Sequence, residues 1–329
     1  MNNKLITTQR ITLLVGIILL IIKFIAYFLT GSNTILTDAL ESIVNVVAGG
    51  FGLFSLYIAA LPKDENHPYG HGKIEFVSAA VEGVLILMAG ILILMKSVYN
   101  LQYPIPIHDV DTGIWITAVA GLINYLLGVY VEQQGKVASS MVLIASGKHL
   151  KSDGYSTLGM ILGLATILFT DWLWLDSVIA ILFGFIILKT GIEVIKSSMA
   201  GIMDEVDYPL VAEIVQLLDK NRHSDCIDVH NLRVIKYGTA LHIDCHITIP
   251  WYFDTRQAHA EVDRLEALLA ANTEKPIEFF IHVDPCIPKS CTICNKKNCP
   301  VRQADWEQNV EWTVENIMLN QKHFLETQQ

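Results

Sequence analysis

The sequence predicts a membrane all-α bundle of six transmembrane helices followed by a small cytoplasmic α+β domain. Three observations carry this prediction. The 329 residues are 52% hydrophobic and 17% charged, with a mean hydropathy of +0.42, which is rare for soluble proteins of this length. Apolar runs of about 20 residues, the length that crosses a bilayer, fill the first 200 positions. After Ser198 the pattern changes to short alternating and helical segments typical of a soluble domain.

Six apolar runs are long enough to span a membrane, and they occupy about residues 10–30, 34–60, 75–99, 112–133, 139–169 and 173–197. We expect the first run to be a spanning helix rather than a cleaved signal peptide, since it is long and lacks a small-residue cleavage site. The loops after the first, third and fifth runs contain no Lys or Arg, whereas basic residues gather at the opposite ends. By the positive-inside rule, both termini are predicted to be cytoplasmic in a multi-pass protein of the cell membrane.

Two pairs of polar residues interrupt these runs. Glu41 and Asn45 lie four positions apart in the second run, and His149 and Asp153 have the same spacing in the fifth, so each pair lies on one face of its helix. A charged group near the bilayer centre costs about 2.5–3.5 kcal/mol on insertion scales and marks a functional site by default. Two helices can thus offer four ligands to one cation, and Asp38 adds a further carboxylate on roughly the face of Glu41. The alternative for Asn45 is a hydrogen bond between helices.

The soluble segment is predicted to fold in the order helix, strand, strand, helix, strand, over residues 208–221, 227–237, 241–249, 255–271 and 277–284. Its second strand alternates apolar and polar side chains, which indicates a sheet with one buried face. Thr255 is the expected cap of the second helix. An open α+β fold with a sheet covered on one face follows, and since so short a domain buries a small core, we expect it to dimerise.

These patterns divide the chain into a membrane domain at residues 1–204, the α+β domain at 205–288 and a cysteine-rich segment at 289–329, in which 306–324 is expected to form an amphipathic helix. The net charge is −10, and residues 201–329, with 12 basic and 20 acidic residues, account for most of it. This acidity argues against nucleic acid as a partner, since phosphate binding needs a basic surface, and it suits metal cations. All six cysteines lie after residue 200, where a cytoplasmic location predicts thiols or metal ligands rather than disulfides.

Residues 64–75, DENHPYGHGKIE, and residues 282–286, HVDPC, form an ordered set of motifs with the two intramembrane pairs. Together they resemble the cation diffusion facilitators over about residues 8–288. The resemblance implies a homodimeric exporter with six transmembrane helices and a cytoplasmic metal-sensing domain of ferredoxin-like or metallochaperone-like shape. It also implies that a divalent transition metal, usually Zn²⁺ and in some branches Fe²⁺, Mn²⁺, Co²⁺, Ni²⁺ or Cd²⁺, leaves the cytoplasm in exchange for protons.

By position, the resemblance assigns the transport site to Glu41, Asn45, His149 and Asp153. Zinc exporters of the family generally have Asp or His at the first of these positions and Asp at the second, so this chain departs from the pattern. Two carboxylates, one imidazole and one amide oxygen form a harder and less charged ligand set, which leaves zinc selectivity open. Asp38 is placed to restore the missing carboxylate.

The resemblance implies further sites outside the membrane. Asp64, His67 and His71 match a metal site near the membrane surface, although turn formation explains the Pro and Gly residues of this loop. Lys73 and Asp204 match a charge interlock between the third helix and the linker, for which solvated surface charges are the alternative.

A dimer-interface metal pair in the soluble domain is the last site that the resemblance implies, with regulatory Zn²⁺ as its expected ion. Its ligands would be His230, His246, His259, His282 and Asp284. The remaining histidines of this domain match no family position and are expected at the surface; they are His223, His242 and His323.

Four cysteines form the pattern Cys286-x4-Cys291-x2-Cys294-x4-Cys299. Four thiolates so closely spaced can enclose a tetrahedral structural Zn²⁺, with an iron–sulfur cluster or unliganded thiols as alternatives. Family members commonly share only the first of these cysteines. Of the two others, Cys245 lies on the apolar side of its strand and is expected in the core, and Cys226 has no assignment.

Two other classes of protein remain open at this point. A membrane-anchored metal sensor or buffer would need the cytoplasmic ligands but not the intramembrane polar quartet. A membrane enzyme with a zinc-bound His/Asp pair would need a substrate pocket, and the sequence has no nucleophile motif such as Gly-x-Ser-x-Gly, so we expect no enzyme. Lys148 and Lys151, which flank His149, have no partner that the sequence alone identifies.

Overall fold

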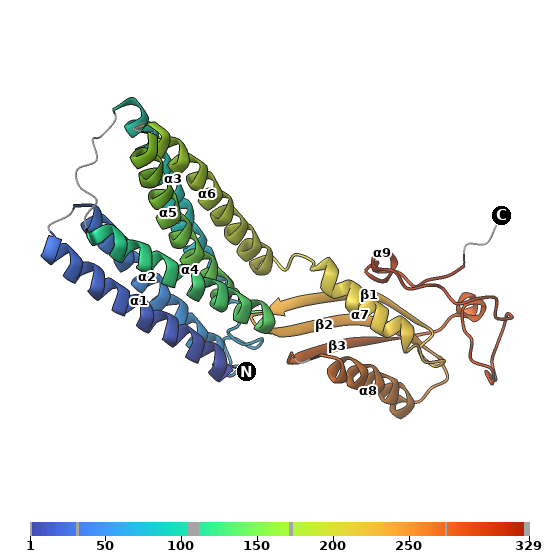
Figure 1. Ribbon diagram of the computed structural model, residues 1–329. Coiled ribbons are helices and arrows are strands. Elements are labelled where there is room, and N and C mark those ends of the chain that lie inside the picture. Colours follow the sequence, from blue (N-terminus) through green and yellow to red (C-terminus); the bar gives the residue numbers. More distant parts are fainter. Residues whose placement is uncertain (1, 31–32, 104–111, 171–173, 274, 326–329) are drawn as a thin grey trace. The chain divides into compact units, whose positions relative to one another are not determined.

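The computed structural model describes residues 2–30, 33–103, 112–170, 174–273 and 275–325 (Figure 1). The chain forms two compact units, Met1–Met203 and Asp204–Gln329. The first is made of long helices, and the second contains a three-stranded sheet with helices. The predicted helical bundle and α+β domain are both confirmed.

Six long helices make up the described part of the first unit: α1 (Asn2–Thr30), α2 (Asn33–Ala59), α3 (Ile74–Gln102), α4 (Thr112–Ala138), α5 (Met141–Thr170) and α6 (Trp174–Ile202). Each contains most of one predicted apolar run. Four of them include a stretch that is long and apolar enough to cross a membrane, namely Lys4–Ile25, Ser42–Ala59, Ile74–Gln102 and Ser177–Ile202. The described part of α5 instead carries several charged residues in its first half, among them the predicted ligands.

Glycines bring α4 and α5 into close contact. They recur every seven residues on α4, at Gly121, Gly128 and Gly135, and each lies against α5. A Cβ atom on Gly128 would lie 2.8 Å from the carbonyl oxygen of Gly147, and one on Gly147 would lie 2.5 Å from the backbone nitrogen of Glu132. Small residues at such spacing let helix backbones approach each other in a membrane. This contact positions α5, the helix that carries two of the predicted ligands.

The second unit contains a sheet with the strand order β1-β2-β3. β1 (Asp228–Tyr237) pairs antiparallel with β2 (Ala240–Ile249), which pairs parallel with β3 (Ile277–Pro285). α7 (Tyr208–Lys220) precedes the sheet, and α8 (Thr255–Ala271) connects β2 to β3. These elements agree with the predicted ranges to within one residue at each end.

One face of this sheet is buried against helices and the other carries polar side chains. Cys245 and Ile247 of β2 join apolar residues of α7 and α8 in one core. Because successive side chains of a strand point to opposite faces, the burial of Cys245 places His246 on the polar face. His230 of β1 and His282 of β3 are paired with His246 in the strand register. The fold therefore creates a row of three histidines across the sheet.

The C-terminal segment differs from its prediction. Residues 306–324 do not form one amphipathic helix, and within them only α9 (Val314–Ile317) is α-helical. Trp312 and Ile317 are buried in the core of the second unit, and Thr313 caps the single turn between them by accepting a hydrogen bond from the Asn316 backbone. Packing of these side chains against the domain overrides the amphipathic pattern.

The predicted cap of α8 is also wrong by one residue. The N-cap is Asp254, whose carboxylate accepts the backbone N–H of Gln257 at 2.8 Å. The Gln257 side chain accepts the backbone N–H of Asp254 in return, which completes a capping box. Thr255 is consequently the first helical residue.

Candidate metal sites

Asn45 of the first intramembrane pair meets the second pair, His149 and Asp153, where α2 contacts α5. The side-chain amide of Asn45 on α2 donates a hydrogen bond to the Asp153 carboxylate on α5 at 2.5 Å. Its oxygen lies 2.9 Å from Nε2 of His149, and this nitrogen lies 3.9 Å from Oδ1 of Asp153. His149 is buried, and the other two are half-buried. The structure thus brings together three of the four residues that the sequence assigns to the transport site.

Hydrogen-bond chemistry defines the state of this group. With the amide nitrogen of Asn45 donating to the carboxylate, its oxygen faces Nε2 of His149, and that nitrogen donates when the imidazole carries a proton there. A proton on Nε2 occupies the lone pair that would bind a metal. Asn45 therefore forms the interhelical hydrogen bond that was its alternative role, and this bond brings His149 and Asp153 close to Asn45. Glu41 lies one turn before Asn45 on α2, and the side chains of Glu41 and Asp38 lie outside the described residues.

A second buried polar cluster in the bundle escapes the sequence analysis. Ser146, three residues before His149 on α5, donates to the Glu82 carboxylate of α3 at 2.6 Å. Gln9 of α1 donates to the Ser146 hydroxyl at 3.3 Å and to the Gly49 carbonyl of α2 at 3.1 Å. Glu82 and Gln9 are 2% and 0% exposed. A lone carboxylate within an apolar run is the signal that indicates such a site.

The lysines that flank His149 have acidic partners on neighbouring helices. Nζ of Lys151 lies 2.8 Å from the Glu132 carboxylate of α4. Nζ of Lys148 lies 3.6 Å from the Glu193 carboxylate of α6. Because these partners lie 19 and 45 positions away along the chain, sequence alone does not identify them. The two cations are therefore balanced by carboxylates other than Asp153.

The loop between α2 and α3 brings its three predicted ligands together. Nδ1 of His67 lies 3.0 Å and Nε2 of His71 lies 3.4 Å from the Asp64 carboxylate, and one ligand atom of each lies within 4.8 Å of the others. The same carboxylate accepts the backbone N–H of His67 at 2.7 Å, a hydrogen bond that lowers the pKa of Asp64. The turn of this loop, which is the alternative reason for its Pro and Gly residues, therefore also brings the three predicted ligands together.

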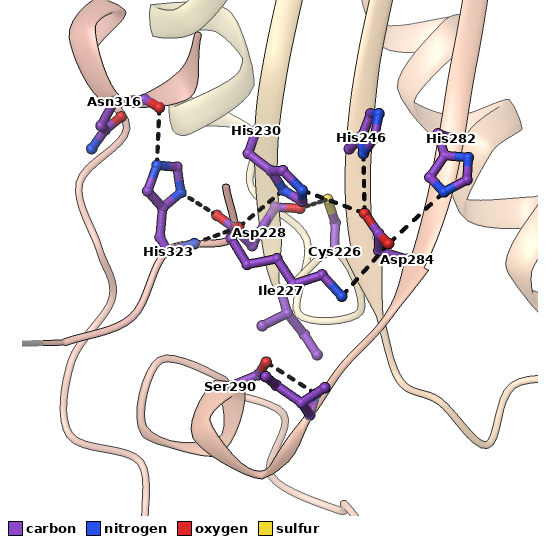
Figure 2. A network of polar contacts seen from close by, with 12 residues as sticks. Cys226, Ile227, Asp228, His230, His246, His282, Asp284, Ser290, Asn316 and His323 are labelled. Carbon is purple, nitrogen blue, oxygen red and sulfur yellow. Dashed lines mark hydrogen bonds and ion pairs between the residues drawn. The ribbon is translucent and has the colours of Figure 1, made fainter. Parts of the chain in front are cut away.

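Figure 2 shows the histidine row of the sheet converging on Asp284. This carboxylate lies 3.3 Å from Nε2 of His230, 3.2 Å from Nδ1 of His246 and 3.8 Å from Nε2 of His282. Ligand atoms of His230, His246 and Asp284 lie within 4.8 Å of one another, a spacing compatible with a shared ion. His259 is 73% exposed on α8 and faces a carboxylate of its own helix, so the structure leaves it apart from the cluster.

A buried carboxylate, that of Asp228, contacts His230 of this sheet site on the side away from Asp284 (Figure 2). Asp228 lies 3.2 Å from Nδ1 of His230 and 2.6 Å from Nδ1 of His323. Burial acts to raise the pKa of Asp228, but hydrogen bonds with the two imidazoles outweigh it and lower that pKa. The Asp228 contact likewise raises the pKa of His323 against the effect of burial. A carboxylate that contacts the second nitrogen of a candidate ligand histidine can fix the orientation of the ring, and sequence reasoning missed Asp228 in this position.

The prediction that the remaining histidines lie at the surface is wrong for two of them. His323 is 8% exposed because Asp228 holds it, and His242 is 9% exposed. Nδ1 of His242 lies 3.1 Å from the Glu278 carboxylate of the adjacent strand. His223 is half-buried and lies 2.9 Å from a carboxylate oxygen of Glu261. Each partner is distant in sequence, so its contribution becomes visible only in the fold.

All six cysteines are free. Cys245 is 2% exposed, as predicted, and Cys226 is 9% exposed. Burial raises the pKa of both thiols, that of Cys245 to about 12, which makes them inert core residues. The cysteines of the C-terminal pattern instead line one pocket together; they are Cys286, Cys291, Cys294 and Cys299.

A helical bundle with a His/Asp/Asn group in its interior, followed by a domain with a histidine–carboxylate site, defines a membrane protein built to handle metal cations. Residues 10–203 match the cation efflux transmembrane domain, and residues 206–286 match the cytoplasmic domain of cation efflux proteins. The chain therefore belongs to the cation diffusion facilitator family, whose members are cation efflux transporters.

Three relatives show how far the similarity extends. An uncharacterized transporter of Synechocystis sp. is 30% identical over 249 residues, which cover 76% of this chain and 80% of that protein. Metal tolerance protein C1 of Arabidopsis thaliana is 26% identical over an alignment of 336 residues, covering 95% of this chain and 70% of the relative. The cation-efflux pump FieF of Salmonella newport is 26% identical over 272 residues, covering 82% and 88%.

Proposed function

We propose that this cation efflux transporter is a proton-coupled antiporter that exports a divalent transition-metal cation from the cytoplasm, with Zn²⁺ as the foremost substrate and Fe²⁺ or Mn²⁺ as further candidates. The observation that supports this most directly is the contact of Asn45 with His149 and Asp153 inside the helical bundle. Polar groups of this kind are costly in lipid, and together they offer an imidazole nitrogen, a carboxylate and an amide oxygen to one ion.

The hydrogen bonds of this group supply the coupling to protons. Nε2 of His149 holds a proton against Asn45, and a metal ion can use that nitrogen only after the proton has left. Metal binding then replaces the contacts of Asn45 with metal–ligand bonds, and it releases a proton when the imidazole of His149 carries a proton on both ring nitrogens beforehand. On the other side of the membrane, a proton returning to His149 displaces the ion. Alternating exposure of one site to two sides makes these exchanges an antiport.

The other predicted sites take regulatory and structural roles in this proposal. We assign regulatory metal binding to the sheet site around Asp284 and a surface site to the loop around Asp64. The cytoplasmic domain would form the homodimer, both termini would be cytoplasmic, and Lys73 and Asp204 would form the charge interlock. The mixed oxygen and nitrogen ligand set is the reason for naming Fe²⁺ and Mn²⁺ beside Zn²⁺.

Transport by purified protein in proteoliposomes with an imposed pH gradient tests the proposal. Asp153→Ala is expected to lower metal flux by more than about 100-fold, since loss of even an outer-shell partner of a metal ligand costs about 10–100-fold. Asp305→Ala, which removes an exposed carboxylate that belongs to none of the proposed sites, is the matched control and should transport normally. Unchanged flux in Asp153→Ala would contradict the site. Metal binding without any flux in the wild type would instead favour a membrane-anchored sensor or buffer.

A further inference from the structure

A pocket in the C-terminal segment is lined by four thiols. Cys286 directly follows β3, and its backbone N–H donates to the Ile249 carbonyl at the end of β2 at 2.8 Å. Cys291 lies in the short 3-10 helix η1 (Pro288–Thr292), and Cys294 and Cys299 follow in the next turns. The pocket between them has a volume of about 20 Å³. This is room for one water-sized occupant, hence for a single ion rather than a polynuclear cluster.

The backbone around this pocket is held by one arginine. The Arg302 guanidinium donates to the carbonyl oxygens of Cys291 at 3.1 Å, Cys294 at 2.9 Å and Lys296 at 2.7 Å. Both cationic residues, Arg302 and Lys296, also line the pocket. A Zn²⁺ ion with four thiolates carries a formal charge of about −2, and two neighbouring cations offset that charge. The surroundings therefore suit a tetrathiolate metal centre.

Hydrogen-bond donors surround the same sulfur atoms. The backbone N–H of Gln303 donates to Sγ of Cys291 at 3.5 Å, and the backbone N–H of Trp251 donates to Cys286. The buried hydroxyl of Tyr252 lies beside Cys299 but makes no hydrogen bond of good geometry in the described part of the chain. A metal-bound thiolate accepts hydrogen bonds more strongly than a neutral thiol, so it would satisfy this hydroxyl.

The segment around the pocket is well packed although it contains little regular structure. Ser290, Ile293 and Cys294 are 2%, 2% and 6% exposed, whereas the described residues of 286–325 form only η1 and the four-residue α9. Irregular segments of this size commonly need a disulfide or a metal ion to hold them, and all six cysteines are free. With no disulfide among the cysteines, a bound metal ion is the cross-link that this segment can form.

We propose that Cys286, Cys291, Cys294 and Cys299 bind one structural Zn²⁺ in tetrahedral geometry, which fixes the C-terminal segment to the edge of the sheet. Three of these four ligands lie beyond residue 286, where the match to the cytoplasmic domain of the family ends. The same segment carries Lys322, whose Nζ lies 3.6 Å from Asp284, and His323, which contacts Asp228. The zinc would therefore also hold the two residues that support the sheet site.

Metal analysis of the purified full-length protein tests this proposal. After treatment with a chelator that strips weaker sites, the wild type is expected to retain about one zinc per chain. Reconstitution with Co²⁺ should give thiolate-to-metal charge transfer and the intense visible bands of a tetrahedral sulfur site. Cys291→Ser/Cys294→Ser should lose both the zinc and the cobalt spectrum, and trypsin should cut the exposed Lys297 faster. Cys291→His retains a ligand and should keep the zinc with an altered spectrum.

The controls separate this site from the others. Cys226→Ala removes a thiol outside the pocket, and Asp153→Ala removes a proposed transport ligand; both variants should keep the zinc. A wild type without tightly bound zinc, or an unchanged metal content in Cys291→Ser/Cys294→Ser, would overturn the proposal. Iron with visible colour would replace it with an iron–sulfur cluster. Because these measurements need no flux, failure of the transport proposal would leave their outcome unaffected.

Discussion

Gly147→Ala should disturb the proposed transport site from a distance. Gly147 lies on α5 two residues before His149, and its added Cβ would lie 2.5 Å from the backbone nitrogen and 2.7 Å from Cα of Glu132 on α4. Ordinary van der Waals contact begins at 3.4 Å. Both partners are backbone atoms, so neither can rotate away. The helices must therefore separate by about 0.9 Å at this point, which is the difference between the 3.4 Å of ordinary contact and the 2.5 Å to the Glu132 nitrogen.

That displacement is large for a metal site. Ligand distances must hold to within about 0.2 Å, and in enzymes a misplacement of 1 Å can cost about 100-fold in rate. Overpacking costs typically about 1–3 kcal/mol, which is offset in part by the helix propensity of Ala, about 1 kcal/mol better than that of Gly. We therefore expect a lower melting temperature in detergent, and metal flux in proteoliposomes at least about tenfold below the wild type.

Gly50→Ala is the matched control. It makes the same substitution on α2, five residues after Asn45, but its Cβ would meet nothing within 4 Å. Only the gain in helix propensity remains, so flux should be unchanged and the melting temperature equal or higher. If Gly147→Ala behaved like Gly50→Ala in both measurements, the close contact of α4 and α5 would not be what positions the ligands.

Two further predictions concern single polar groups. Asn45→Leu should lower flux about tenfold or more, because it removes the hydrogen bonds that Asn45 makes with His149 and Asp153, and a hydrogen bond to such a group contributes about 1–3 kcal/mol. Asn45→Asp should bind Zn²⁺ more tightly in a titration, and weaker binding would argue against Asn45 as a ligand. Asp207 caps α7 and forms an ion pair with Lys236. Burial acts to raise the pKa of Asp207, but the ion pair and the cap hydrogen bond outweigh burial and lower that pKa. Its stabilisation should be present above the usual pKa of 3.8 and disappear as pH falls through the lower folded value. In thermal melts, Asp207→Asn should keep the cap but should no longer lose stability as the pH falls. Asp207→Ala should lower the free energy of unfolding by about 1 kcal/mol at neutral pH. Identical pH profiles of stability for Asp207→Asn and the wild type would contradict this role of Asp207.

Local pattern is enough to predict most of this fold. Apolar length alone predicts the six helices, and alternation in 241–249 predicts both the strand and its buried face. The same face predicts the position of His246, whereas the family resemblance, and not the alternation, predicts the metal site at Asp284. The family resemblance likewise predicts Asp64, His67 and His71 as ligands of the loop, and one turn brings all three together.

Residues whose surroundings come from distant parts of the chain are not predictable in this way. His323 has no local signal, and only Asp228, 95 positions earlier, explains its burial. The segment 306–324 looks amphipathic because its apolar residues pack into the core, yet Trp312 and Ile317 reach that core without forming a long helix. The interior carboxylate Glu82 is detectable as a charge in an apolar run, but its partner Ser146 is an ordinary helix residue in sequence.

The contacts of α5 differ in strength, and this difference predicts where the bundle would open in the proposed transport cycle. Toward α4, α5 has interlocking glycine contacts and the Lys151–Glu132 ion pair. Toward α2, the neutral amide of Asn45 makes hydrogen bonds with both His149 and Asp153, and a metal ion bound by these residues would replace those contacts. We therefore expect α4 and α5 to move together, with the change occurring between α2 and α5. On this reasoning Asn45→Leu should alter the pH dependence of flux, whereas Gly147→Ala should lower flux at every pH; the same pH profile in both variants would place the opening elsewhere.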